Sequence, residues 1–190
     1  DTPETKWLNP SDAARLLDVL DGLEDVQWKC FFYLSLYTGA RPGELIALNW
    51  QDIDLEKSTI HIRASAEYVK GEGTHRRALL AYRLPFGKNW PEPDAVFTTD
   101  DGHRVNISTP THVFRKLVKR YELPPLTLYG LRHTAASLMI AEGLPIRDVA
   151  ARLGHSQTST TLDIYAHALI DSNSRATDAI SRALEEARKA

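Results

Sequence analysis

Residues 126–169 read LTLYGLRHTAASLMIAEGLPIRDVAARLGHSQTSTTLDIYAHAL, and this stretch decides the fold. Its apolar residues recur at helical spacing over 127–142, over 145–153 and again from 159 onward. A glycine follows each of the first two runs, as is common where a helix ends, and a proline opens the second. The stretch therefore predicts three consecutive helices joined by short turns.

The same stretch carries three side chains with a shared chemical use, Arg132, His155 and Tyr165. A second arginine, Arg41, lies upstream in TGARPGEL, where the following proline predicts a bend at the start of a helix. A phenol with a pKa of about 10 is a poor nucleophile at neutral pH unless nearby cations lower that pKa. Two guanidiniums would also neutralise the charge that builds on a transferring phosphate. The set indicates metal-free attack on a phosphodiester, with His155 as hydrogen-bond donor or proton acceptor.

Each of these residues also has a plain structural interpretation. Arg41 could pair with a nearby carboxylate, and His155 could be a histidine without a ligand. Tyr165 lies on an amphipathic stripe and could be a tyrosine of the core or of its rim. Only the ordered set favours catalysis over these alternatives.

Composition is that of an ordinary globular protein. The 190 residues are 43% hydrophobic and 25% charged, with a net charge of −2, which argues mildly against a nucleic-acid partner. The charge is uneven, because residues 1–40 sum to −4 and residues 103–132 to +5. An acidic shell with a basic middle can still bind DNA on one face. A single cysteine, Cys30, excludes an internal disulfide, and no Cys/His pattern has zinc spacing.

Upstream of residue 126 the sequence predicts more helix than strand. Helices are expected over 10–22 with Asn9 as cap, over 25–38 as a central core helix, over 75–84, and over 109–121 with Thr109 as cap. Alternating residues over 58–69 predict a half-buried strand, and residues 95–98 a second, short one. The expected fold class is mainly α with a small antiparallel β-sheet (α+β).

The predicted strand over 58–69 lacks a partner in the sequence. A turn follows at 70–73, but the next residues have a helical pattern where a second strand is expected. A lone strand leaves its hydrogen-bonding edges unpaired. We therefore expect that a β-hairpin that would follow Gly73 is missing.

One helix combines an apolar face with a basic one. Over 109–121 the polar side carries four cations, Arg115, Lys116, Lys119 and Arg120. These charges could track the phosphates of DNA, or they could be an ordinary solvated face. The sequence favours neither.

The segments GARPGEL, LRHTAAS, LGHS and TTLDIYAH, in this order and spacing, resemble the catalytic domain of tyrosine site-specific recombinases, the phage integrase family. The resemblance covers residues 9–169. It implies that Arg41 and Arg132 clamp the scissile phosphate, that His155 matches the family's third motif, and that Tyr165 is the nucleophile. It also implies a recombinase of phages and other mobile elements that forms a 3′-phosphotyrosyl link, frees a 5′-hydroxyl and rejoins DNA without cofactor, metal or ATP.

The sequence departs from that family in two ways. Tyr129 stands where the family usually has histidine, three residues before Arg132. A phenol can still donate a hydrogen bond there. The family's catalytic lysine lies on the hairpin after the first strand, where this chain is short, and Lys70 lies before that hairpin. Loss of a general acid costs about 10²–10⁴-fold in rate. The alternative function is therefore a DNA-binding module of the same fold with impaired catalysis.

The resemblance also implies an assembly. A single catalytic domain is expected over 1–190, without the family's N-terminal DNA-clamping domain. Its last helix, 174–190, is either exchanged with a neighbouring protomer or packed on its own domain. The expected partners are double-stranded DNA and further copies of the chain in a tetrameric synapse, with no membrane. The sequence shows no leader and no apolar run of membrane-spanning length, so the bacterial cytoplasm, at the nucleoid, is the expected location. A further alternative is an unrelated helical protein whose motifs are coincidental.

Overall fold

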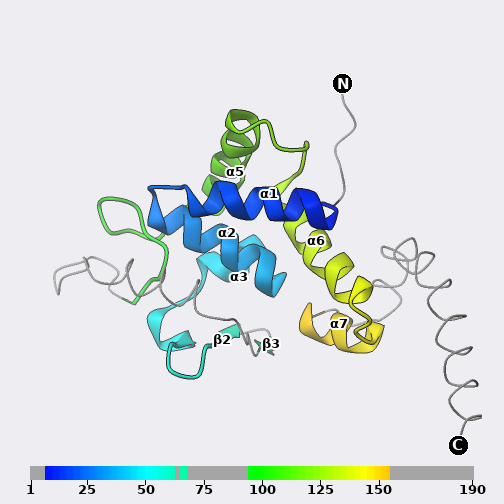
Figure 1. The fold of residues 1–190 in the computed structure, drawn as a ribbon. Coiled ribbons are helices and arrows are strands. Elements are labelled where there is room, and N and C mark those ends of the chain that lie inside the picture. Colours follow the sequence, from blue (N-terminus) through cyan, green and yellow to red (C-terminus); the bar gives the residue numbers. More distant parts are fainter. Residues whose placement is uncertain (1–6, 63–64, 68–93, 155–190) are drawn as a thin grey trace, which may run out of the picture. The chain divides into compact units, whose positions relative to one another are not determined.

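The computed structural model describes residues 7–62, 65–67 and 94–154. The helices and strands there are α1 (Pro10–Asp21), α2 (Val26–Thr38), α3 (Pro42–Ile46), the 3-10 helix η1 (Trp50–Asp52), β1 (Ile53–Asp54), β2 (Thr59–Ile62), β3 (Ser65–Glu67), α5 (Thr109–Arg120), α6 (Leu128–Ala141) and α7 (Ile146–Arg152) (Figure 1). The predicted class, mainly helical with a small antiparallel sheet, is confirmed. The helices predicted over 75–84, from 159 and over 174–190 lie outside the described residues.

The chain divides into two compact units, residues 1–135 and 136–190, and the division falls within α6. The prediction of one catalytic domain over 1–190 is not tested by this division and stays a prediction. Each unit has its own packing, described in turn below.

α2 is the centre of the first unit, as its apolar sequence predicts. It lies beside α1 (Figure 1). Phe31 packs edge-on against Phe97 with ring centres 5.0 Å apart, and Phe32 against Phe114 of α5 at 5.1 Å. All four rings are fully buried. Fixing α2 among aromatic residues of distant segments also fixes its carboxyl end, which leads directly into the Arg41 segment.

The helix caps agree with the sequence in one case and differ in another. The Asn9 side-chain oxygen accepts the Asp12 amide at 2.8 Å, so the predicted cap of α1 is confirmed. The predicted cap Thr109 is wrong, because Thr109 is the first residue of α5 and the N-cap position is Ser108. The Ser108 hydroxyl donates to the Asn106 side chain at 2.9 Å instead of capping the helix. A hydroxyl next to an asparagine has a local alternative to the helix end.

The sheet corrects the prediction of one continuous strand over 58–69. The structure has two short strands there, β2 and β3, which pair antiparallel with Ile62 opposite Ser65. β1 pairs with the other edge of β2, Ile53 opposite Ile60, so the sheet order is β1-β2-β3. The expectation of a partnerless strand and a missing partner is therefore wrong for residues 59–67. A hairpin after Gly73 would lie outside the described residues.

The alternating pattern itself explains why one long strand was predicted over 58–69. Alternation of buried and exposed residues has the same period in one long strand and in two strands joined by a tight turn. The buried Ile60 and Ile62 and the exposed His61 of β2 do follow the predicted pattern. The strand predicted over 95–98 is likewise wrong as a strand. Its ends form only isolated bridges, Ala95 to Asn49 and Thr98 to Arg104.

The second unit contains the end of α6 and all of α7 among its described residues. Their contact is a small apolar cluster, Ala136, Ile140, Val149 and Leu153, with Met139 against it. Gly143, between the helices, has a φ of +85°, and Gly154, after α7, a φ of +66°. The predicted helix stops at both glycines are confirmed, since glycine takes this left-handed conformation without strain.

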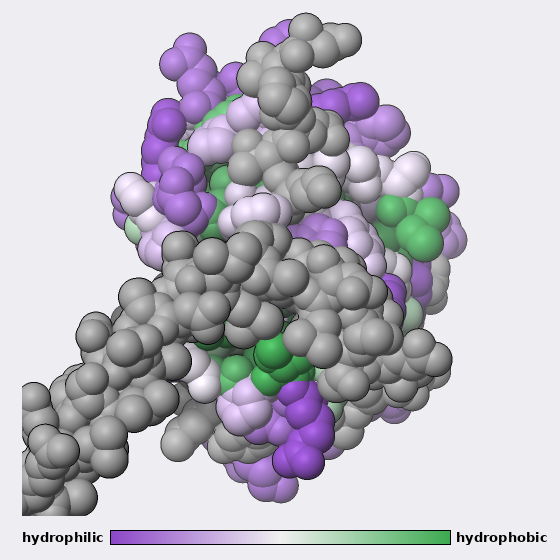
Figure 2. All heavy atoms as spheres, turned by 90° about the vertical axis from the view of Figure 1, so that its right-hand side faces the viewer, coloured by the Kyte–Doolittle hydropathy of each residue, from purple (hydrophilic) through white to green (hydrophobic). Residues whose placement is uncertain are grey.

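On the face that Figure 2 shows, the visible described residues are mostly hydrophilic, with apolar residues in small separate areas. The large apolar side chains that stay exposed are Tyr37, Ile107, Tyr129 and Leu144. No helix in the described part of the chain is long and apolar enough to cross a membrane.

Candidate active site

Arg41 lies at the start of α3, as predicted from the proline that follows it. It has extended backbone angles, and its carbonyl accepts a hydrogen bond from the backbone amide of Glu44, in the first turn of the helix, at 2.9 Å. Its guanidinium Nη1 donates to Glu44 Oε1 at 2.8 Å. The structural interpretation expected Arg41 to pair with a nearby carboxylate, and this ion pair with Glu44 is confirmed. The side chain remains 42% exposed, so the guanidinium also faces solvent.

Arg132 is held differently, inside the protein. It is 2% exposed, and its Nη1 donates to the Gly39 carbonyl at 2.6 Å. Gly39 ends α2 in the left-handed conformation, with φ of +66°. The hydroxyl of Thr38 accepts the Ala40 amide at 2.9 Å and steadies the same turn. Arg132 is thus bound to the segment that leads directly into Arg41.

Tyr129 lies on the first turn of α6, one turn before Arg132, and is 45% exposed. Its ring meets the His133 ring edge-on, with centres 5.3 Å apart. The pKa of Arg41 is raised, first by its hydrogen bond to Glu44 and further by the Glu44 charge. Burial acts in the opposite direction. The contact that the structure gives Tyr129 is thus with His133, on its own helix.

Three of the five predicted catalytic residues, Arg41, Tyr129 and Arg132, lie in the described part of the chain, and Arg132 is bound two residues before Arg41, at Gly39. His155 and Tyr165 lie outside the described residues, as does Lys70. Among the described residues no group of His, Cys, Asp and Glu side chains could hold a metal ion.

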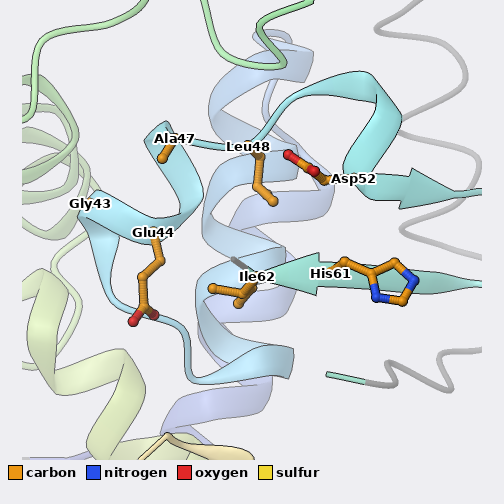
Figure 3. Close-up of a pocket in the computed structure, with 7 residues that line it drawn as sticks. All are labelled: Gly43, Glu44, Ala47, Leu48, Asp52, His61 and Ile62. Atoms are coloured by element: carbon orange, nitrogen blue, oxygen red, sulfur yellow. The ribbon is translucent and has the colours of Figure 1, made fainter. Parts of the chain in front are cut away.

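Glu44 is a residue of this site that the sequence interpretation missed. One carboxylate oxygen accepts from the guanidinium, and the other, Oε2, accepts the backbone amide of Arg41 at 2.7 Å. Glutamate three residues after a helix start is the known signal of a capping box and would have pointed to it. Glu44 also lines a mostly apolar pocket of about 230 Å³ between α3 and β2. Figure 3 shows Leu48 and Ile62 in its middle, with Glu44 and Asp52 on opposite sides.

The four cations of α5 are all exposed, in two pairs. Lys116 and Arg120 line a pocket of about 170 Å³ that also contains Asp25 and Trp28. Arg115 Nη2 lies 3.1 Å from His112 Nδ1. The DNA-tracking face and the solvated face both stay predictions.

Comparisons with known proteins agree with the motifs. The family model described as the phage integrase family matches residues 6–171, and the chain belongs to this family. A tyrosine recombinase XerC-like protein of Caldanaerobacter subterraneus subsp. tengcongensis is 26% identical over 200 residues, covering 86% of this chain and 51% of the relative. The chain thus spans about half the length of the curated relatives it matches.

Two solved structures have the same fold. The XerA recombinase superposes with a TM-score of 0.78 and 28% identity, over 92% of this chain and 65% of that one. The Tn1549 transposon integrase, in complex with transposon right end DNA, has a TM-score of 0.75 and 21% identity, over 95% of this chain and 68% of that one. At that identity the second comparison shows the fold alone.

Proposed function

We propose that this chain is the strand-transfer part of a site-specific DNA recombinase, an integrase that cuts and rejoins double-stranded DNA. The supporting observation is that Arg132 is bound to the Gly39 carbonyl, two residues before Arg41, although the two arginines are far apart in sequence. In a member of the phage integrase family, paired guanidiniums suit a phosphodiester better than any other common substrate.

In the proposed reaction the Tyr165 phenol oxygen attacks the scissile phosphorus. A P–O(Tyr) bond forms, the bond from phosphorus to the 5′-oxygen breaks, and the DNA is left joined through a 3′-phosphotyrosyl link. The phenol proton passes to His155 or to water, and the 5′-oxygen takes a proton to leave as a hydroxyl. Arg41 and Arg132 offset the charge on the non-bridging oxygens. Attack by a 5′-hydroxyl of a partner strand reverses the step, so no metal or ATP is required.

The proposed assembly is a tetramer of the whole protein on DNA, with the chain acting at the bacterial nucleoid. The second candidate function is a DNA-binding module with impaired catalysis. The observation that favours it is Tyr129, an exposed phenol in the place of the family's histidine. A phenol is a poor proton acceptor at neutral pH. The absence of a hairpin lysine from the sequence would add to the impairment.

A suicide-substrate experiment separates the two functions. The 190-residue chain is incubated with nicked duplexes of randomised sequence, in which the released 5′-fragment diffuses away and traps the covalent intermediate. The recombinase proposal expects a denaturant-stable protein–DNA adduct that disappears in Tyr165→Phe. DNA retention on a filter without any adduct overturns the recombinase proposal and supports the binding module. If the experiment gives no adduct and no DNA retention, both candidate functions are contradicted.

A further inference from the structure

We infer that Arg104 is a positioning residue for Arg41, because its guanidinium holds the carboxyl end of α3, the short helix that begins directly after Arg41. By sequence alone Arg104 is one of the cations of the basic stretch 103–132. The structure gives this cation an internal use instead. The effect on α3 is independent of any reaction, whereas its consequence for DNA cleavage rests on the proposed function.

The Arg104 guanidinium contacts three oxygen atoms at the end of α3. Nη1 donates to the Ile46 carbonyl at 2.5 Å and to the Leu48 carbonyl at 3.1 Å, and Nη2 donates to Asn49 Oδ1 at 2.7 Å. Ile46 is the last residue of α3, and the last carbonyls of a helix have no partner within it. A planar guanidinium can reach several oxygens at once, which a single ammonium group does less well. Arg104 therefore caps the carboxyl end of α3.

Arg104 belongs to a turn that is itself fixed on α2. Arg104 forms an antiparallel bridge with Thr98, and the next amide, of Val105, donates to the Phe97 carbonyl at 3.1 Å. The Thr98 amide donates to the side chain of Gln27, a residue of α2, at 2.8 Å. The Phe97 ring packs on the same helix. The guanidinium of Arg104 thus connects the end of α3 to the central helix of the first unit.

The helix α3 is short enough to depend on support at both ends. It has five residues, and isolated helices shorter than about 12 residues are marginal in water. At its start the chain comes directly from Gly39, where α2 ends. The Leu45 amide donates to the Arg41 carbonyl at 3.2 Å, so a movement of the helix also moves Arg41. Both ends of α3 are therefore set by α2, one through the chain and the other through Arg104.

A role in binding a DNA phosphate fits these contacts less well. A cation that binds a phosphate turns its N–H groups to solvent, whereas Nη1 and Nη2 of Arg104 both donate to protein oxygens in a partly buried position. Holding α3 in place, in contrast, acts on the phosphate clamp through Arg41. Such an effect can be large, because a misplacement of about 1 Å can cost about 10²-fold in rate.

Amide hydrogen exchange of the 190-residue chain tests the effect on α3 without reference to activity. We expect the amides of Leu45 and Ala47 to exchange about 10-fold faster in Arg104→Gln, and the amides of α2 to keep their rates. Arg15→Gln is the matched control, because Arg15 Nη2 donates to a carbonyl after another helix, that of Tyr121 after α5, at 3.1 Å. It should leave the amides of α3 unchanged.

Two outcomes of the exchange experiment overturn the inference. Unchanged rates at Leu45 and Ala47 in Arg104→Gln would mean that Arg104 does not hold α3. Equal acceleration in α2 would mean that Arg104 stabilises the whole first unit and not this helix. If Arg104→Gln does not fold, Arg104→Lys replaces it, and its single ammonium group should give a smaller acceleration at the same two amides.

The consequence for cleavage is tested with the suicide substrate at several DNA concentrations. We expect Arg104→Gln to lower the maximal rate of single-turnover adduct formation about 10-fold, with an unchanged DNA concentration at half the maximal rate. Arg104→Lys should recover part of the loss, and Arg15→Gln should show none.

A double-mutant cycle tests whether the loss passes through Arg41. In the Arg41→Lys background Arg104→Gln should have no further effect on the rate. Additive losses, or a raised half-maximal DNA concentration, contradict a role through Arg41. If the unmodified chain forms no adduct, the proposed function fails, while the exchange rates at Leu45 and Ala47 still decide whether Arg104 holds α3.

Discussion

Arg41 and Glu44 are joined twice, guanidinium to carboxylate at 2.8 Å and backbone amide to carboxylate at 2.7 Å. The first contact is half exposed and belongs to a class of ion pairs worth about 0–1 kcal/mol. The second satisfies an amide at the helix start, as side chains that cap helices do. One carboxylate thus fixes both the backbone and the side chain of the arginine.

Substitution of Glu44 should separate these two contacts. Glu44→Gln keeps an acceptor for the Arg41 amide, so we expect it to lower the free energy of unfolding by less than about 1 kcal/mol. Glu44→Ala removes both contacts, and we expect about 1–2 kcal/mol. Urea unfolding of the two variants measures the difference. Equal losses would mean that the backbone contact contributes nothing.

Gly39 should matter to the site more than a glycine of the same conformation elsewhere. Gly39 and Gly143 both have positive φ, +66° and +85°, so alanine at either position should cost about 1 kcal/mol of stability. A Cβ at Gly143 would meet nothing within 4 Å, which makes Gly143→Ala a matched control for strain alone. Only Gly39→Ala should also slow adduct formation, because Arg132 is bound to the Gly39 carbonyl. Equal cleavage rates in the two variants would contradict this.

The sequence predicted the helical part of the fold well and the sheet poorly. Helix limits depend on local signals, such as Asn9 before α1 or the glycine after α2, and these hold in the structure. Strand partners depend on which segments meet, and the period of alternation cannot distinguish a long strand from the β2–β3 pair. Within the described residues, the sequence therefore placed the helices to within a few residues and missed that residues 59–67 form two paired strands.

For the site, motif order predicted which residues to examine but not how they are held. Arg132 is buried against Gly39 while Arg41 stays partly exposed, and this depends on a long-range contact between α6 and the turn after α2 that has no local signal in the sequence. Glu44, in contrast, had a local signal in its spacing from Arg41. The roles of His155 and Tyr165 remain predictions.

Cys30 should make stability fall at alkaline pH. The thiol is 1% exposed, and burial is the largest cause that raises its pKa from 9.0 to about 12. Above pH 9 the unfolded chain loses this proton while the folded chain keeps it, so unfolding becomes more favourable. The contribution of the protonated Cys30 thiol to the free energy of unfolding is complete below pH 9 and is lost between pH 9 and 12. The free energy of unfolding then falls by at most about 1.4 kcal/mol per pH unit from this group.

The measurement compares the unmodified chain with Cys30→Ala in urea at pH 7 to 10.5. Cys30→Ala should be less stable at neutral pH, because it leaves a small cavity. Its stability should fall less steeply above pH 9, where other alkaline titrations affect both proteins equally. Parallel curves across this range would show that the Cys30 thiol is not protected.

The last prediction concerns the two basic pairs of α5. Lys116 and Arg120 share their pocket with Asp25, whose charge offsets theirs, and Arg120 lies over the Tyr121 ring at 5.5 Å. Arg115 and Lys119 lie on the neighbouring stripe, and we expect that stripe to follow the DNA phosphates. Each lost phosphate contact lowers the slope of log affinity against log salt by about 1. The double variant Arg115→Gln with Lys119→Gln should therefore lower this slope by about 2, and Lys116→Gln with Arg120→Gln should leave the slope nearly unchanged.

Filter binding of a 30-base-pair duplex, a length of about three helical turns, at several salt concentrations measures the slope for both double variants. Unchanged slopes in both double variants would mean that α5 is an ordinary solvated face.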